Sequence, residues 1–156
     1  MKKNIFQKGF TLIELLVVVA IIGILASVVL ASLNSARAKG ADAAIKANLS
    51  NIRAQAEIVY DGNTPNQYGS ATHALGYCQN TASTLFADAN VYNAITSAKS
   101  VAGVSTTGGA DRCYSTTSAW LVSVPLKTDS AKSWCVDNAG ASREVTTTAV
   151  VGTSCP

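Results

Sequence analysis

The feature that most constrains this chain is an uninterrupted apolar stretch near its start. From Leu15 to Ala36, 22 consecutive residues carry no ionisable side chain, and nearly all are Leu, Val, Ile, Ala or Gly. As an α-helix rising about 1.5 Å per residue, this stretch covers roughly 33 Å, compared with roughly 30 Å for the hydrocarbon core of a bilayer. The stretch is therefore long enough to form a single transmembrane helix.

The basic residues before this stretch set its expected orientation. Lys2, Lys3 and Lys8 precede it, and the formal net charge of the whole 156-residue chain is +3. Lys and Arg flank membrane helices on the cytoplasmic side, so a cytoplasmic N-terminus is expected. The rest of the chain balances nine Lys and Arg against nine Asp and Glu. The chain apart from these three lysines therefore has no net charge. This balance argues against a dedicated nucleic-acid surface, which needs clustered positive charge.

A secretory signal peptide is the first alternative, since it also combines a basic start with an apolar stretch. Ala36-Arg37-Ala38 even offers small residues around a cleavage point. The apolar region of a signal peptide has about 7 to 15 residues, however, and this one is longer. Glu14 also directly precedes the stretch. A carboxylate there either reaches back to the membrane edge or has a cationic partner.

Cleavage between Gly9 and Phe10 would create such a cation. The new α-amino group would lie four residues before Glu14, on the same face of a helix. The surrounding residues closely resemble the class III leader and N-terminal helix of type IV pilins and type II secretion pseudopilins. The resemblance runs through Lys8-Gly9-Phe10-Thr11-Leu12-Ile13-Glu14-Leu15-Leu16-Val17-Val18-Val19-Ala20-Ile21-Ile22-Gly23-Ile24-Leu25-Ala26.

This resemblance implies a prepilin peptidase that cuts after Gly9 on the cytoplasmic side and N-methylates Phe10. Glu14 matches the acidic residue that, in this family, pairs with the α-amino group of a neighbouring subunit and sets the register of assembly. Gly23 falls where pilins carry a glycine that loosens the helix, although close packing explains a glycine equally well. Ala31 stands where many pilins have proline, so a pronounced kink is not expected.

Past the apolar stretch the pattern becomes amphipathic. Apolar residues recur at steps of three and four, which places them on one helical face. Asp42 and Lys46 have the spacing of a helical ion pair, and Asp61–Pro65 contains helix-ending residues. One helix is therefore expected from about residue 10 to residue 60. Its buried face would consist of Ala41, Ile45, Leu49, Ile52, Ala56 and Val59.

The remaining residues, about 63–156, are rich in Ser, Thr, Asn, Gly and Ala, and such a small core needs covalent stabilisation. All four cysteines lie there, and an N-in helix would export them to an oxidising compartment. Two disulfides are expected, and of the three pairings we favour those between neighbours in the chain. The spacing contains no Cys-x-x-Cys pair, which argues against a metal site. The favoured bridges are Cys78 with Cys113 and Cys135 with Cys155.

The pattern of this C-terminal region predicts a helix followed by an antiparallel sheet. The helical segment is expected over 81–100, with a loop over 103–109. Trp120 and Trp134 would pack the sheet against the helix face of Ile45, Leu49 and Ile52. The three expected strands are 119–124, 133–136 and 143–151, with turns at 125–130 and 138–140 and an optional fourth strand at 112–115.

No pattern in the chain points to catalysis. There is no phosphate-binding loop, nucleophile elbow or pair of metal-binding histidines. His73 is the one histidine and is interpreted as a loop residue. Asp129 and Asp137 raise the question of calcium, which some secretion pseudopilins bind, but too few oxygen ligands cluster around them. We therefore expect no enzyme activity, no metal and no cofactor.

The combined expectation is an α+β, type IV pilin-like fold. A long N-terminal helix, transmembrane and then amphipathic, would pack on a small antiparallel sheet stapled by two disulfides. The resemblance implies four segments. These are a leader peptide at 1–9, a transmembrane and filament-core helix at 10–36, an amphipathic upper half at 37–62 and a globular head at 63–156.

By the same resemblance, the chain would be a prepilin that polymerises through its N-terminal helices into a surface filament for adhesion or motility. Its partners would be copies of itself, the prepilin peptidase, the inner-membrane assembly machinery and, before assembly, the membrane. Three alternatives remain open. The chain could be a type II secretion pseudopilin forming a periplasmic pseudopilus, a DNA-uptake pilin with an electropositive stripe, or a membrane anchor for an enzyme.

Overall fold

The computed structural model describes residues 9–105, 109–150 and 152–156. Of the expected leader at 1–9, only Gly9 is among them. The chain divides into two compact units, one ending at Arg37 and one spanning Ala38–Pro156. Helix α1, Leu12–Gly62, contributes its first part to the former and its second part to the latter. We call the second unit the head.

Helix α1 confirms the expected single long helix, with 51 residues. Up to Arg37 every described side chain is exposed, as expected for a helix that is apolar all round. In the head part, one face is buried, and its members are Asp42, Ile45, Leu49, Ile52 and Ala56. Ala41 and Val59 are half-buried at its margins. The three-and-four spacing therefore predicted this face correctly at its centre.

The head contains a five-stranded antiparallel sheet in the order β1-β2-β3-β4-β5. This meander corrects the expected three or four strands, because it adds β1, which is too short to show an alternating pattern. His73 is accordingly the buried first residue of a strand and not a loop residue. The strands are β1 His73–Gly76, β2 Arg112–Ser115, β3 Trp120–Pro125, β4 Lys132–Asp137 and β5 Ser142–Thr146.

Helix α2, Ala89–Ala102, is shorter than the expected segment 81–100 at its start. The Asp88 carboxylate accepts hydrogen bonds from the backbone N–H groups of Asn90 and Val91, at 2.9 and 3.0 Å, and so begins the helix. The residues before it form a 3-10 turn, Leu85–Ala87. A second 3-10 turn, Thr147–Ala149, ends β5 earlier than the expected strand 143–151, whose last residue lies outside the described residues.

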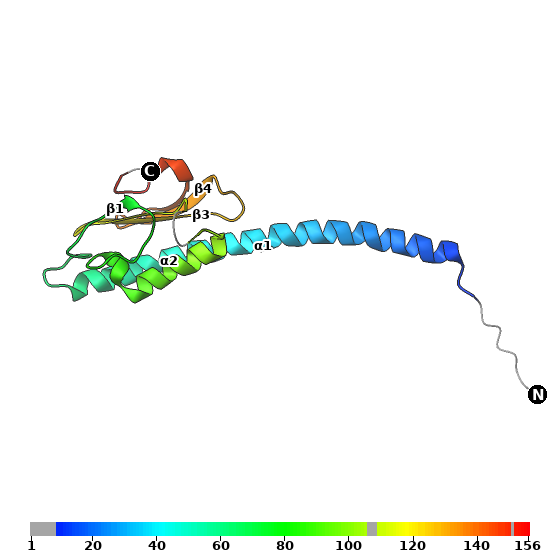
Figure 1. Cartoon of the computed structure of the whole chain (residues 1–156), viewed down its shortest axis with the longest axis horizontal. Coiled ribbons are helices and arrows are strands. Elements are labelled where there is room, and N and C mark those ends of the chain that lie inside the picture. The colour runs from blue at the N-terminus through cyan, green and yellow to red at the C-terminus, as the bar shows by residue number, and fades with distance from the viewer. Residues whose placement is uncertain (1–8, 106–108, 151) are drawn as a thin grey trace, which may run out of the picture. The chain divides into compact units, whose positions relative to one another are not determined.

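The main core lies between the sheet and the two helices on one of its faces (Figure 1). Trp120 is fully buried in the same cluster as Ile45, Leu49 and Ile52, and Trp134 is partly buried against it. The expected packing of both tryptophans is confirmed. Because side chains alternate along a strand, a smaller cluster forms on the opposite face. It contains Leu121, Cys135, Val145, Val150 and Cys155.

The expected ion pair between Asp42 and Lys46 is absent from the described residues. The Asp42 carboxylate is buried and accepts hydrogen bonds from the backbone N–H of Lys127 at 2.5 Å, from that of Thr128 and from the Thr128 hydroxyl. The Lys46 ammonium instead lies 4.7 Å from the centre of the Trp134 ring. Asp42 therefore ties α1 to the β3–β4 turn, a contact 85 residues away in sequence.

Candidate functional site

Helix α1 begins with reciprocal hydrogen bonds between Thr11 and Glu14. One Glu14 oxygen accepts from the Thr11 backbone N–H at 2.9 Å and from its hydroxyl at 2.6 Å. The Glu14 backbone N–H donates to the Thr11 hydroxyl oxygen at 3.3 Å. This arrangement is a capping box, whose Thr-x-x-Glu pattern is visible in the sequence. Thr11, and not Phe10, is the partner of the Glu14 carboxylate among the described residues.

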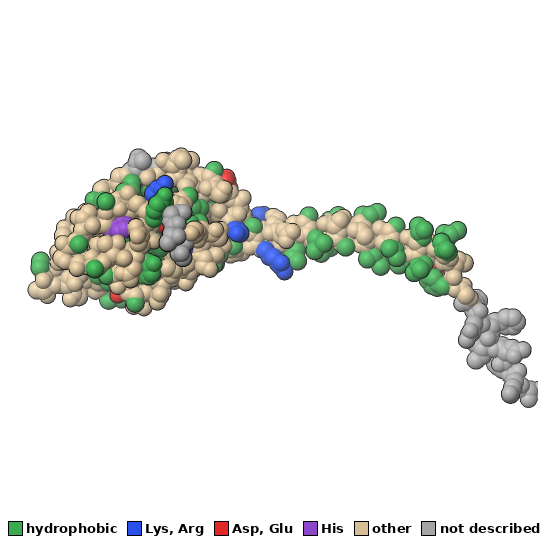
Figure 2. Space-filling view, in the orientation of Figure 1, with side chains coloured by type: hydrophobic (Ala, Val, Ile, Leu, Met, Phe, Trp, Pro, Cys, Tyr) green, Lys and Arg blue, Asp and Glu red, His purple; other side chains and the backbone are tan. Residues whose placement is uncertain are grey.

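The first part of α1 presents a continuous apolar surface. Phe10 is 76% exposed, Ile24 66% and Leu33 41%. The helix is long and apolar enough to cross a membrane, with a mean hydropathy of 3.0 over its most apolar 18-residue window and none of that window buried. Figure 2 shows hydrophobic side chains along this part of the chain, and Lys and Arg side chains follow them. Such a surface is stable only in lipid or against other apolar helices.

The two glycines singled out in this region are not required by packing within the subunit. A methyl group added at either Gly9 or Gly23 would meet no atom of the described residues within 4 Å, apart from the adjoining backbone. Gly23 nevertheless weakens the middle of a helix by about 1 kcal/mol relative to Ala. Any requirement for glycine at these two positions therefore concerns a molecule outside the subunit, or flexibility.

Two disulfides staple the head, as the fold prediction expects, and they join Cys78 to Cys113 and Cys135 to Cys155. These are the pairings favoured above. The first bridge spans 35 residues and the second 20. Each closes a long loop in a domain whose described core is small, so each restricts the unfolded chain substantially.

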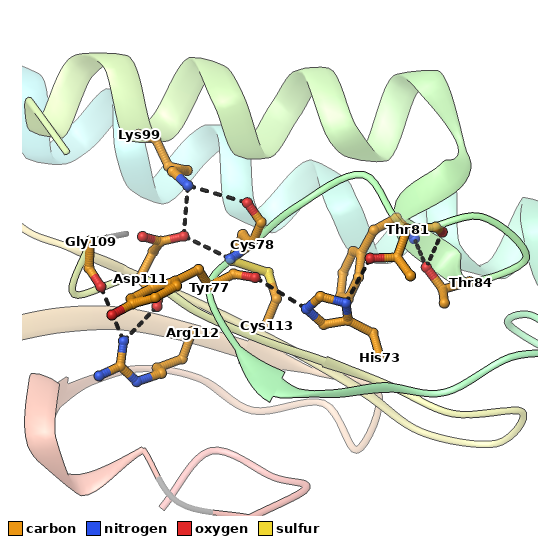
Figure 3. Close-up of a disulfide and its surroundings, with 11 residues drawn as sticks. His73, Tyr77, Cys78, Thr81, Thr84, Lys99, Gly109, Asp111, Arg112 and Cys113 are labelled. Carbon is orange, nitrogen blue, oxygen red and sulfur yellow. Dashed lines mark hydrogen bonds and ion pairs between the residues drawn. A yellow bond between two sulfur atoms is a disulfide. The ribbon is translucent and has the colours of Figure 1, made fainter. Parts of the chain in front are cut away.

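A buried ion pair supports the first disulfide (Figure 3). Lys99 of α2 and Asp111, just before β2, have almost no exposed side-chain surface, and their charged atoms are 2.7 Å apart. The same Asp111 oxygen accepts from the Cys78 backbone N–H at 2.8 Å, and Lys99 donates to the Cys78 carbonyl at 3.2 Å. The pair therefore holds both backbone groups of Cys78. The local sequence pattern does not predict this ion pair, because nothing in it marks either residue.

The second disulfide is supported by Asp137. One carboxylate oxygen accepts from the Cys155 backbone N–H at 2.8 Å and the other from that of Ala141 at 2.9 Å. Asp129 similarly accepts from the Ala131 backbone N–H at 3.0 Å. Both carboxylates raised above as calcium ligands thus have backbone partners. The described residues contain no group of three or more His, Cys, Asp or Glu side chains placed to hold a metal ion.

His73 and Tyr68 also have structural roles. The two His73 ring nitrogens lie 2.9 Å from the Thr81 hydroxyl and 3.1 Å from the Tyr77 carbonyl, so the ring is fully engaged. Burial is the main cause that raises the pKa of Tyr68 to about 12, and a hydrogen bond to the Glu57 carboxylate is the next largest cause. At the surface, the hydrogen bond to Glu144 raises the pKa of Lys132. No arrangement among these groups supports catalysis.

Comparison with known proteins agrees with this geometry. Residues 6–30 match the family model described as the prokaryotic N-terminal methylation motif. The chain is 39% identical to the type IV wide pilus major component PilA4 of Thermus thermophilus over 90 residues. The matched region covers 54% of this chain and 69% of that relative. No solved structure matches the chain. The methylation motif, the long apolar helix, the stapled antiparallel head and this relative together place the chain in the type IV pilin family, as a structural subunit and not an enzyme.

Proposed function

We propose that this pilin is made as a prepilin, cut after Gly9, N-methylated at Phe10 and polymerised through the first part of α1 into an extracellular filament. The observation that carries the proposal is the wholly exposed apolar surface of that part of the helix, which overlaps the methylation motif. Lipid can cover this surface before assembly, and the same helices of other subunits can cover it afterwards.

Glu14 would take a new partner during assembly. In the subunit its carboxylate is bound by Thr11. After cleavage, the α-amino group of Phe10 on a neighbouring subunit would offer a full positive charge, which is a stronger partner than a hydroxyl. Removal of both charges from water offsets much of this gain, so the pair would determine register more than overall stability.

The division of the chain follows from this proposal. Residues 1–9 would be the leader, 10–36 the membrane and filament-core helix, 37–62 the amphipathic upper half and 63–156 the globular part of the head. The lysines before the helix would keep the N-terminus in the cytoplasm and place the head outside the inner membrane. The relative is named as a major component of a wide pilus, which favours a filament beyond the cell over a periplasmic pseudopilus.

The decisive experiment is intact mass spectrometry of protein sheared from the surface of the native producer, before and after reduction. A chain that begins at N-methylated Phe10 is expected, together with the mass increase for two reduced disulfides. Absence of sheared protein, with processed protein retained in the periplasm, would favour a pseudopilus. A mass that retains the leader would contradict prepilin processing.

A matched pair of glycine variants tests the cleavage position. Gly9→Val should block processing, and Gly40→Val, outside the methylation motif, should not. Among the residues that the structure describes, a Cβ at either position would meet nothing within 4 Å apart from the adjoining backbone. A difference between the two variants therefore reports recognition by the peptidase and not a packing defect. Normal processing of Gly9→Val would contradict the proposed cut.

A further inference from the structure

Charge is distributed unevenly along the head. Between Ala54 and Ala98, 45 consecutive residues contain three acidic residues and no Lys or Arg. The three are Glu57 and Asp61, which are exposed near the end of α1, and Asp88, which is half-buried at the start of α2. We call these three residues the acidic end.

Neutral turns complete the acidic end. Tyr68 lies in the segment that follows α1. Its backbone N–H donates to the Thr117 carbonyl in the β2–β3 turn at 3.0 Å. The Asn138 amide in the β4–β5 turn lies 3.4 Å from the Ser118 carbonyl of the same β2–β3 turn. Residues 116–119 and 138–141 contain no charged side chain. These turns therefore add no charge of their own, and Arg53, one helical turn before Glu57, donates to the Asp137 and Ala141 carbonyls at the β4–β5 turn.

Three lysines lie where α1 enters the head. Lys39 and Lys46 are on α1, and Lys127 is in the β3–β4 turn that Asp42 binds. We call these lysines the basic end. The ion pairs among the described residues are Lys99 with Asp111 and Lys132 with Glu144, so none of the three lysines is in an ion pair there. Figure 2 shows Lys and Arg side chains at this end of the head with an acidic side chain near them, and Glu144 lines the same surface hollow as Lys39 and Lys46.

Both ends use the same face of α1. Lys39 and Glu57 are 18 residues apart, which is five turns of helix, so their side chains leave the helix in the same direction. The distance between them along the axis is about 27 Å. Asp61 lies one further turn along. A second copy displaced by roughly this distance, with its helix parallel, would bring its Lys39 level with Glu57 and Asp61 of the first.

We propose that the acidic end of one subunit binds the basic end of a second copy of this chain. The surface is self-complementary and heterologous, since each copy offers both signs at opposite ends, and repetition extends it along a filament without closure. This inference rests on the proposed polymerisation and adds a contact between heads to the contact between N-terminal helices. It also gives the growing filament a directional preference for parallel subunits.

The test is a charge-reversal cycle in the native producer, read as the amount of sheared filament relative to processed subunit. Asp61→Lys and Lys39→Glu should each lower this ratio by roughly fivefold or more at low salt, because reversal replaces an attractive contact with a repulsive one. The double variant should recover most of the loss. Both side chains are exposed, so neither change is expected to prevent folding.

Two controls separate charge at this surface from charge in general. Asp61→Asn and Ser97→Lys alter the net charge equally, but Ser97 is exposed on α2 and is not one of the residues of either end. Asp61→Asn should lower the ratio and Ser97→Lys should not. Added salt should shrink all differences, since charges are screened over about 10 Å at 0.1 M.

The outcomes are distinguishable. If Asp61→Lys gave the wild-type ratio of sheared filament to processed subunit, the proposed contact between heads would be overturned and the proposed polymerisation would stand. A loss in Lys39→Glu alone, with no recovery in the double variant, would assign the lysines to another partner and also overturn it. Failure of the wild-type chain to form any filament would overturn the proposed polymerisation itself, and this contact with it.

Discussion

The two parts of helix α1 differ in where they find their partners. Up to Arg37 every described side chain is exposed and most are apolar. From Ala38 onward the helix buries one face against the sheet and α2, while the other faces water. A helix that is apolar all round cannot bury all of its apolar surface within so small a subunit, whereas an amphipathic helix can bury its single apolar face.

This difference teaches that one continuous helix serves two separate tasks. Loss of an interaction in the first part should leave the head folded and abolish assembly. Loss of an interaction in the head should lower its stability first. The following predictions test that separation, beginning with the largest expected effect.

Glu14→Gln should reduce sheared filament by at least about 100-fold, because removal of one charge from a buried pair costs roughly 3–5 kcal/mol. Gln can replace Glu in a capping box, so the start of α1 and processing should be unaffected. The measurement is an immunoblot of sheared and cell-associated protein. Thr11→Ala is the control, since it removes the cap, worth about 1 kcal/mol, and keeps the charge. Normal filaments from Glu14→Gln would contradict the pairing.

Lys99→Met should lower the free energy of unfolding of the head by about 3–5 kcal/mol, because Asp111 would remain buried without its partner. The measurement is urea unfolding of the full chain in detergent, followed by tryptophan fluorescence. Lys99→Met combined with Asp111→Leu should recover part of the loss but not all, since the Cys78 N–H would lack its acceptor. A loss below about 1 kcal/mol would indicate a solvated, weakly coupled pair.

Replacement of both cysteines of one bridge by Ser should cost about 3–4 kcal/mol, with the larger loss for Cys78–Cys113 because its loop is longer. The same unfolding experiment measures this effect. Circular dichroism of each variant below its melting temperature should show no loss of total helical content. A melting temperature that does not change when the disulfides are reduced would contradict their stabilising role.

Alkaline pH should destabilise the head through Tyr68. Its pKa is raised to about 12, so the fold favours the neutral phenol. This contribution is fully present below the ordinary tyrosine pKa of about 10 and is lost as the pH rises towards 12. Ultraviolet titration of tyrosinate should reveal one late-titrating group that Tyr68→Phe removes. Titration of every tyrosine near pH 10 would contradict burial of this phenol.

Gly23→Ala should have the smallest effect, because it adds a methyl group in open space and stabilises the helix by about 1 kcal/mol. If Gly23 loosens the helix during assembly, filament yield should fall modestly while processing stays normal. Gly40→Ala is the matched control, since a Cβ there also meets nothing within 4 Å. Equal yields from both variants would show that assembly needs no special flexibility at Gly23.

Local patterns in the sequence predicted much of this protein. The apolar stretch, the buried positions Ile45, Leu49 and Ile52, and the strand around Trp120 all follow from short-range periodicity. The favoured cysteine pairing also appears in the structure. The start of α2 was placed too early, although Asp88 is an N-cap residue type. The capping box of Thr11 and Glu14 is likewise visible in the sequence as a Thr-x-x-Glu pattern.

Tertiary structure alone decided the contacts between residues distant in sequence. Asp42 has Lys46 one helical turn away, yet it binds a turn 85 residues later, because burial made backbone N–H donors its nearest partners. Lys99 and Asp111 became a buried pair only when α2 and β2 converged on Cys78. The periodicity of a helix or strand depends on residues that are near in sequence, so it can be predicted from the sequence. The partner of a buried charge depends instead on which distant segments fold against it.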